Sequence, residues 1–297
     1  MKQASGCAAT TNMTAAEPSH GRLVAAARLG VSRDWAFEQA SSGTFFGVSA
    51  LLFAASAAVT IVCSASMSAM GEMPMPGGWT MSLVWIRMPG QTWPGAAASF
   101  LDMWVVMMVA MMLPSLIPTL WRYRQAVGGT GATRLGRLAT LAGVGYFFVW
   151  TVFGMIAFPL GVALAAVEMQ YPSLARAVPL ALGVVVLIAG GVQFGAWKAY
   201  HLACCRETPG CGGTLPANVG TALRHGLRLG LHCSYCCINL MTILLVIGVM
   251  DLRAMVVVTA AITAERLASA HKRAARAIGA VTIGAGLFLI ARAAGLG

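Results

Sequence analysis

Three cysteines and a histidine lie close together in one apolar segment of the chain, LGLHCSYCCINLMTILLVIGVM. These residues are His232, Cys233, Cys236 and Cys237. In a helix, residues three and four apart are neighbours, so the three thiols would crowd onto adjoining faces. A single buried cysteine commonly packs as a small hydrophobe, but polar groups at membrane depth are costly and are usually functional. The cluster therefore predicts an intramembrane site for a soft metal.

Methionines form the second group of candidate ligands. In DMWVVMMVAMM, Met103, Met107 and Met111 recur every four residues, and Met112 lies on the adjoining face. A second run, MSAMGEMPMP, holds the methionines of Met67–Met75. The first run has an alternative role in core packing, because methionine fills irregular gaps. The second has an alternative role in a membrane-interface belt, because tryptophans typical of such a belt lie nearby. Thiolate and thioether together favour Cu(I), whereas methionine adds nothing for zinc.

A third cluster lies in the segment KAYHLACCRETPGC. His201 and Cys205 are four residues apart and would share a helix face, with Cys204 and Cys211 nearby. The alternative is a set of free cytosolic thiols kept reduced.

Three further residues are weaker candidates for the metal site. His225 precedes His232 by seven residues, so the two histidines lie on nearly one line of a helix. Glu265 is expected to orient a histidine or to pair with Arg266. No catalytic carboxylate pair, Ser/His/Asp set or phosphate loop is evident, so we do not expect an enzyme.

Composition places these residues in a membrane. The chain has 297 residues, of which 58% are hydrophobic and only 10% are charged, whereas soluble domains carry about 25% charged residues. The net charge of +11 comes from Lys and Arg between the apolar spans, as the positive-inside rule predicts, and does not indicate nucleic-acid binding.

The apolar stretches predict an all-α fold, a polytopic integral membrane helix bundle of about seven transmembrane helices. Residues 1–42 are expected to form a polar, disordered cytoplasmic tail, and residues 43–297 the transmembrane metal-binding domain. Lys and Arg in alternate loops indicate that the N-terminus is inside. Gly191 and Gly195 form a GxxxG pair suited to close helix packing. The predicted spans are Thr44–Ser66, Ala97–Leu120, Leu138–Val167, Ala177–Trp197, Gly226–Met250, Ala254–Ala268 and Ala277–Ala293.

Four blocks of the sequence resemble the signatures of a known family. They are LDMWVVMMVAMMLPS, KAYHLACCRETP, CSYCCINLMTILLVIGVMDL and AER. The chain is similar over about Ser99–Ala294 to a bacterial family of predicted metal-binding integral membrane proteins, a domain-of-unknown-function group whose members are sometimes labelled copper chaperones. The resemblance implies functional roles for Met103, Trp104, Met107, Met111, Met112, Cys233, Cys236, Cys237, Asp251 and Glu265.

The chain departs from the family pattern at several positions, which indicates a divergent member. His201 stands where similar proteins have a cysteine, and this keeps a ligand but shifts its metal preference. Leu229 replaces a usual histidine, for which His225 and His232 are positioned to compensate. Ile238 replaces a tryptophan, and Asp251 replaces an asparagine.

Together these features predict a multi-pass protein of the bacterial inner membrane that binds Cu(I) for copper transport or for delivery to a cuproenzyme. Its expected partners are the lipid bilayer, a metal ion, and a cuproprotein or other membrane subunits. In this hypothesis the methionines of Met67–Met75 collect the ion, and Met103, Met107 and Met111 pass it inward to the thiols. The alternatives are a membrane thiol-disulfide oxidoreductase using Cys233 and Cys236, a haem protein with histidine axial ligands, and an assembly role for a cuproenzyme.

Overall fold

The computed structural model describes residues 20–295, apart from positions 70, 72, 77, 88, 89, 128–130 and 207–215. Side chains are described from residue 42 onward, except those of residues 132 and 206. The chain divides into two compact units, Met1–Thr44 and Phe45–Gly297. All of the candidate site residues belong to the second unit.

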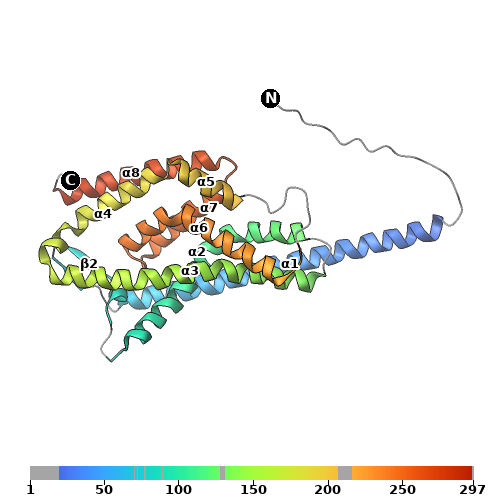
Figure 1. Cartoon of the computed structure of the whole chain (residues 1–297), viewed down its shortest axis with the longest axis horizontal. Coiled ribbons are helices and arrows are strands. Elements are labelled where there is room, and N and C mark those ends of the chain that lie inside the picture. Colours follow the sequence, from blue (N-terminus) through green and yellow to red (C-terminus); the bar gives the residue numbers. More distant parts are fainter. Residues whose placement is uncertain are drawn as a thin grey trace. The chain divides into compact units, whose positions relative to one another are not determined.

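The described residues confirm the all-α prediction, because helices form nearly all of the regular structure (Figure 1). The exception is a short antiparallel hairpin that pairs Met73 with Met81. The elements are α1 (His20–Ala69), β1 (Met73–Met75), β2 (Trp79–Met81), the 3₁₀ turn η1 (Leu83–Trp85), α2 (Trp93–Val127), α3 (Ala132–Gln170), α4 (Pro172–Val192), α5 (Ala196–Arg206), α6 (Val219–Ile247), α7 (Leu252–Leu267) and α8 (His271–Ala293).

Six helical segments in the described part of the chain are long and apolar enough to cross a membrane. The predicted count of seven is therefore not confirmed. The difference is α7, which has 16 residues and a length of about 24 Å, short of the roughly 30 Å hydrocarbon core. The segments are Ser42–Ala69, Trp93–Val127, Thr133–Gln170, Pro172–Val192, Val219–Ile247 and His271–Ala293.

The predicted tail, residues 1–42, lies largely outside the described residues. The backbone of α1 begins at His20, within this segment. Nothing in the described structure tests whether the tail is cytoplasmic, and its orientation stays a prediction.

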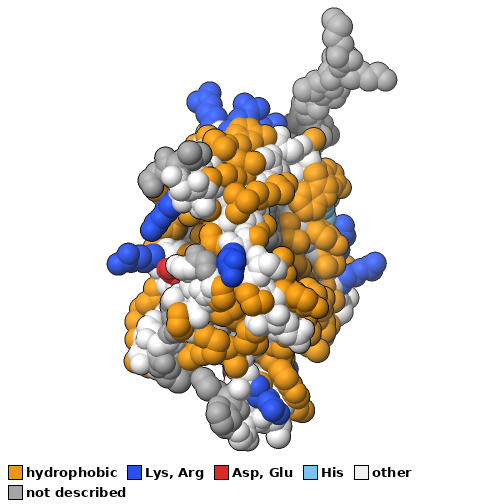
Figure 2. All heavy atoms as spheres, turned by 90° about the vertical axis from the view of Figure 1, so that its left-hand side faces the viewer, with side chains coloured by type: hydrophobic (Ala, Val, Ile, Leu, Met, Phe, Trp, Pro, Cys, Tyr) orange, Lys and Arg blue, Asp and Glu red, His pale blue; other side chains and the backbone are white. Residues whose placement is uncertain are grey.

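Helices α2 and α6 form the interior of the bundle. Of the most apolar 18-residue window in each, 56% is buried, against 11–28% for the other spans. The outer helices carry exposed large hydrophobic side chains such as Val62, Leu160 and Val281. Figure 2 shows one face on which hydrophobic side chains are widespread, together with other side chains and a few Lys and Arg residues. This outward apolar surface suits contact with lipid and leaves α6, the thiol-bearing helix, at the centre.

Glycines on α6 let this helix approach α3 closely. A Cβ atom at Gly226 would lie 2.0 Å from the Ala142 carbonyl oxygen, and one at Gly230 would lie 3.0 Å from the Tyr146 carbonyl oxygen. Small residues at such contacts are the usual means of tight helix packing in membranes. This packing holds Tyr146 against the thiol-bearing face of α6.

A second glycine contact joins α4 and α8, which lie side by side (Figure 1). A Cβ atom at Gly190 would lie 2.8 Å from Ile283, and one at Gly286 would lie 2.7 Å from Leu187. The predicted packing pair, Gly191 and Gly195, does not serve this contact, because a Cβ atom at Gly191 would meet nothing within 4 Å. The GxxxG prediction therefore identified the wrong glycines.

The turn between α6 and α7 is built by a glycine and a cap. Gly248 has φ 143°, a backbone conformation that favours glycine. Asp251 then caps α7, because its carboxylate accepts a hydrogen bond from the Ala254 amide at 2.9 Å. In α1, the Ser64 hydroxyl donates to the Met250 carbonyl at 2.6 Å, which ties that helix to the turn.

The methionine run before α2 is only partly exposed, and its role in collecting the ion stays a prediction. Met75 is 9% exposed and lies with Met81, on the other hairpin strand, in a small buried cluster, whereas Met73 is 36% exposed. Met67 is half-buried against the main core, and Met70 lies outside the described residues. The indole nitrogen of Trp79 donates to the Ala175 carbonyl at 2.8 Å and so holds the hairpin to α4.

Candidate metal centre

The three cysteines of α6 lie together in the buried interior. The sulfur atoms of Cys233, Cys236 and Cys237 are all within 4.8 Å of one another, and each side chain is at most 1% exposed. The Sγ atoms of Cys236 and Cys237 are 3.4 Å apart, and those of Cys233 and Cys237 are 3.8 Å apart. No other group of three His, Cys, Asp or Glu ligands this close was found among the described residues. The helical spacing seen in the sequence thus brings the thiols to one place.

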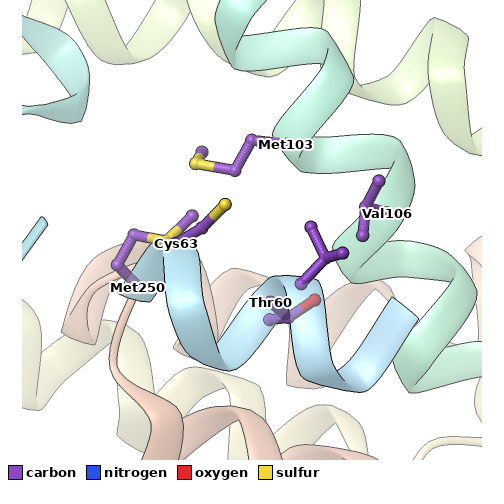
Figure 3. A pocket seen from close by; sticks show the side chains of 6 residues that line it. Thr60, Cys63, Met103, Val106 and Met250 are labelled. Atoms are coloured by element: carbon purple, nitrogen blue, oxygen red, sulfur yellow. The ribbon is translucent and has the colours of Figure 1, made fainter. Parts of the chain in front are cut away.

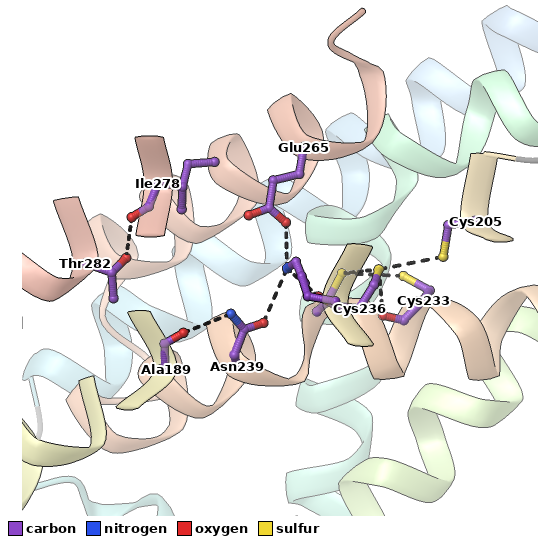
Figure 4. Close-up of polar contacts among 10 residues, drawn as sticks. Ala189, Cys205, Cys233, Cys236, Asn239, Glu265, Ile278 and Thr282 are labelled. Atoms are coloured by element: carbon purple, nitrogen blue, oxygen red, sulfur yellow. Dashed lines mark hydrogen bonds and ion pairs between the residues drawn. The ribbon is translucent and has the colours of Figure 1, made fainter. Parts of the chain in front are cut away.

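A fourth thiol reaches this cluster from α5. The Cys205 Sγ lies 3.6 Å from the Cys236 Sγ, and the Cys205 side chain is 2% exposed (Figure 4). The hydrogen bond with Cys236 and burial raise the pKa of the Cys205 thiol well above its usual range. The neighbouring Cys204 is half-buried, and Cys211 lies outside the described residues.

A buried guanidinium borders the cluster on the α7 side. Arg266 is 4% exposed, and its Nη1 lies 3.3 Å from the Cys233 Sγ. The same nitrogen donates to the Ser115 hydroxyl at 2.9 Å. The Tyr146 hydroxyl donates to the Cys233 Sγ at 3.0 Å. A positive charge at this position favours the deprotonated thiol, which is the form that binds metals.

A buried ion pair between α5 and α7 also lies next to the cluster (Figure 4). The Lys198 Nζ lies 2.7 Å from the Glu265 Oε2, and both side chains are 1% exposed. Lys198 also donates to the backbone carbonyl of Cys236 and, at 3.4 Å, to the Asn239 Oδ1. These contacts join α5, α6 and α7 around the thiols. Glu265 therefore pairs with Lys198, whereas Arg266 contacts Cys233 and Ser115.

The two candidate histidines of α5 and α6 contact each other. The Nδ1 atoms of His201 and His232 are 3.4 Å apart, and both side chains are half-buried. Trp197 and Tyr235 pack against His201, with ring centroids 4.7 and 5.0 Å away. His232 is not part of the close group of three thiols.

Two other candidates lie in contacts that need no metal. The His225 ring stacks on Tyr123, with centroids 4.8 Å apart and planes 11° apart. Asp251 is exposed and caps α7. Neither residue belongs to the close thiol group.

The candidate methionines of α2 divide into two sets. Met107, Met111 and Met112 are 0–3% exposed and belong to the same hydrophobic core cluster as the α6 thiols. Met103 is half-buried at the edge of this core and lines a small pocket. Trp104, the remaining α2 residue implied by the resemblance, is fully buried and donates to the Trp150 carbonyl at 2.8 Å.

Sequence reasoning missed the two basic residues beside the thiols. The positive-inside pattern counts Lys198 and Arg266 only as charges that set the orientation, whereas both side chains are buried. A signal was present, because Lys198 follows an apolar run directly and Arg266 ends a short apolar helix. Ionisable residues at membrane depth commonly mark function. Nothing in the sequence distinguishes Tyr146 or Ser115 from ordinary helix residues.

Comparison with known proteins identifies the family. No curated protein and no solved structure matches the chain. The model of the PpoB2 family matches residues 101–289, which include most of α2, all of α3 to α7 and most of α8. The chain therefore belongs to the PpoB2 family, which is described as copper chaperone.

Proposed function

We propose that this protein is a membrane copper chaperone that holds Cu(I) at Cys233, Cys236 and Cys237 and passes it to another protein. The observation that carries the proposal is the group of three buried thiols within 4.8 Å of one another, with a guanidinium 3.3 Å from one sulfur. Thiolates are the ligands that soft metals prefer. Membership of a family described as copper chaperone supports the choice of metal.

The ligand number favours Cu(I) over zinc. Structural zinc sites are almost always closed by four ligands, whereas three thiols form the close group. Cys205 contacts only one of them among the recorded sulfur contacts, Cys236. The charges are also compatible with a monovalent ion. With two of the three cysteines as thiolates and the third protonated, the ligands and one Cu(I) carry a charge of −1, which Arg266 offsets, while Lys198 and Glu265 neutralise each other.

Release requires a ligand outside the close group of three thiols. Cys205 meets this requirement, because it lies on a different helix, α5, which has 11 residues and is not among the candidate spans. Its sulfur is 3.6 Å from that of Cys236. One turn before it on the same helix, His201 meets His232 among exposed aromatic side chains, which are enriched at membrane–water interfaces. We propose that the metal leaves through Cys205 and this histidine pair.

Metal content of the purified full-length protein tests the binding step. The protein would be loaded anaerobically with Cu(I) in detergent and then exposed to a competing chelator, with Zn²⁺ in a parallel sample. We expect the wild type to retain one more Cu(I) than a Cys233/Cys236/Cys237→Ser triple variant. Equal copper retention in both proteins, or retention of zinc and not of copper, would contradict the proposal.

The rate of metal transfer tests the release step. A Cys205→Ser variant is expected to retain Cu(I) at the thiol centre but to pass it to an external chelator about tenfold more slowly, within the range typical of losing an outer partner. Cys204→Ser is the matched control, because it removes the adjacent, half-buried thiol. Equal transfer rates in the two variants would exclude Cys205 as the exit ligand.

A further inference from the structure

A small pocket lies away from the thiol centre, where α1, α2 and the turn before α7 meet. Its open volume, including the mouth, is about 190 Å³. Figure 3 shows the sulfur-bearing side chains gathered at one end of the pocket, with Thr60 and Val106 at the other. The residues that line it are Val59, Thr60, Cys63, Met103, Val106 and Met250.

Three of these residues carry sulfur, and they come from three separate parts of the chain. Cys63 lies on α1, Met103 on α2, and Met250 in the turn that follows α6. Cys63 and Met103 are half-buried, and Met250 is 8% exposed. The hydrogen bond from the Ser64 hydroxyl to the Met250 carbonyl holds the neighbour of Cys63 against this turn. The fold therefore assembles one thiol and two thioethers that the sequence keeps far apart.

We propose that this pocket is a second soft-metal site, in which Cys63 Sγ and the thioether sulfurs of Met103 and Met250 bind one Cu(I) ion. On binding, the Cys63 thiol releases its proton to the solvent and its sulfur bonds to the metal. The two thioethers ligate without losing a proton. No electron is transferred, and the ion remains Cu(I).

The charge of the pocket determines which ion it accepts. None of the residues that line it is charged. One thiolate and one Cu(I) are together neutral, so the occupied site needs no compensating side chain. A divalent ion would leave a net positive charge in apolar surroundings, which is costly. The pocket therefore favours a monovalent soft ion, and Ag(I) serves as a redox-inert probe of it.

A metal-binding role accounts for the three sulfur-bearing side chains at this pocket better than core packing does. Methionine is flexible and fills irregular gaps in cores, yet here the gap beside the sulfurs remains open. Cys63 and Met103 also stay half-buried and so remain reachable from outside the protein. The open gap and the partly exposed ligands allow an ion to enter this pocket directly.

The pocket and the thiol centre lie near opposite ends of one ridge of α2. Met103, Met107, Met111 and Ser115 recur every four residues, and Ser115 accepts the hydrogen bond from Arg266 beside the thiols. At 1.5 Å per residue the ridge is about 18 Å long. The pocket is thus placed to receive the ion that the thiol centre holds. This entrance role rests on the proposed function, whereas metal binding in the pocket does not.

Binding of Ag(I) and Cu(I) to the full-length protein in detergent tests the proposal. The background is the Cys233/Cys236/Cys237→Ser variant, so that the thiol centre does not contribute, and a competing chelator suppresses binding to single thiols. We expect the background to retain one ion, and Cys63→Ser to abolish that retention. The Met103→Leu/Met250→Leu double variant should bind at least tenfold more weakly. Cys204→Ser and Met155→Leu, an exposed methionine of α3, are the matched controls.

Each outcome shows whether the sulfur-bearing residues of the pocket bind metal or only pack against one another. If the double variant binds as tightly as the background, or if Cys63→Ser and Cys204→Ser have equal effects, the proposal is overturned. Failure of the proposed function would appear separately, as equal metal content in the wild type and the triple variant. In the wild-type chain, alkylation of Cys63 followed by mass spectrometry provides a test without substitution. Ag(I) should slow the reaction at least tenfold, and an unchanged rate overturns the proposal.

Discussion

The two interior helices both carry rows of sulfur, but the surroundings of the two rows differ. On α6, the thiols contact other polar groups, including Arg266 at 3.3 Å from Cys233 and Cys205 at 3.6 Å from Cys236. On α2, Met107 and Met111 are almost fully buried in the hydrophobic core. Spacing alone therefore does not separate a ligand from a packing residue. On α6 the further evidence is the contact of the thiols with Arg266 and with Cys205.

The largest effect is expected from Cys236→Ser, because this residue contacts two other thiols, Cys237 and Cys205. Losing an outer partner of a metal site typically weakens affinity by about 10–100-fold, and losing this ligand should weaken Cu(I) binding by more than about 100-fold. Competition against a chelator under anaerobic conditions measures the affinity. Serine is close in size to cysteine, so the fold should persist, which size-exclusion chromatography checks. A loss below tenfold would place the metal elsewhere.

The next largest effect is expected when the charge beside Cys233 is removed. Arg266→Met should weaken Cu(I) affinity by about 10–100-fold, because the thiolate loses its neighbouring cation. Arg266→Lys keeps the charge and should restore most of the affinity. Metal binding releases thiol protons, so the deficit of Arg266→Met should grow as the pH falls. Equal affinities for Arg266→Met and Arg266→Lys would show that the side chain serves packing alone.

The grouping of the α6 thiols could be predicted from the sequence, because it follows from helical periodicity. Cys233, Cys236 and Cys237 need only one helix to bring them within 4.8 Å. The contacts made by other helices could not be predicted in this way. Cys205, Lys198 and Arg266 reach the thiols only after α5 and α7 have packed on α6, and no local pattern specifies that packing.

The burial of charged side chains at helix ends was the feature least predictable from the sequence. Positively charged residues near a span ordinarily lie in loops, and the sequence alone assigns Lys198 to a loop for this reason. The structure buries it at 1% exposure, because Glu265 supplies a carboxylate 2.7 Å away. A charged residue can be buried only where such a partner exists. Predicting that Lys198 is buried therefore requires knowing where Glu265 lies in space, and the sequence does not give this.

A smaller effect is expected from a change that moves α6 relative to α3. Gly226→Ala places a Cβ atom against the Ala142 carbonyl, and such overpacking typically costs about 1–3 kcal/mol. We expect a lower midpoint of thermal unfolding and weaker Cu(I) binding, because Tyr146 on α3 contacts Cys233. Gly191→Ala is the matched control, since nothing lies within 4 Å of its added Cβ. Equal midpoints for both variants would refute a role for Gly226 in this contact.

The smallest effect is expected at the α2 thioethers, where the comparison with α6 is most easily broken. Leucine nearly matches the volume of methionine, and such exchanges usually cost less than about 1.5 kcal/mol. Met107→Leu and Met111→Leu should therefore change the equilibrium affinity of the thiol centre by less than about threefold, since both side chains are buried in the hydrophobic core cluster. The chelator competition used for Cys236→Ser measures this directly. A loss as large as that of Arg266→Met would make these thioethers ligands of the centre, and the α2 sulfurs would then belong with those of α6. If instead only the rate of loading from outside falls, while the equilibrium affinity is unchanged, the methionine ridge acts as the path along which the ion travels.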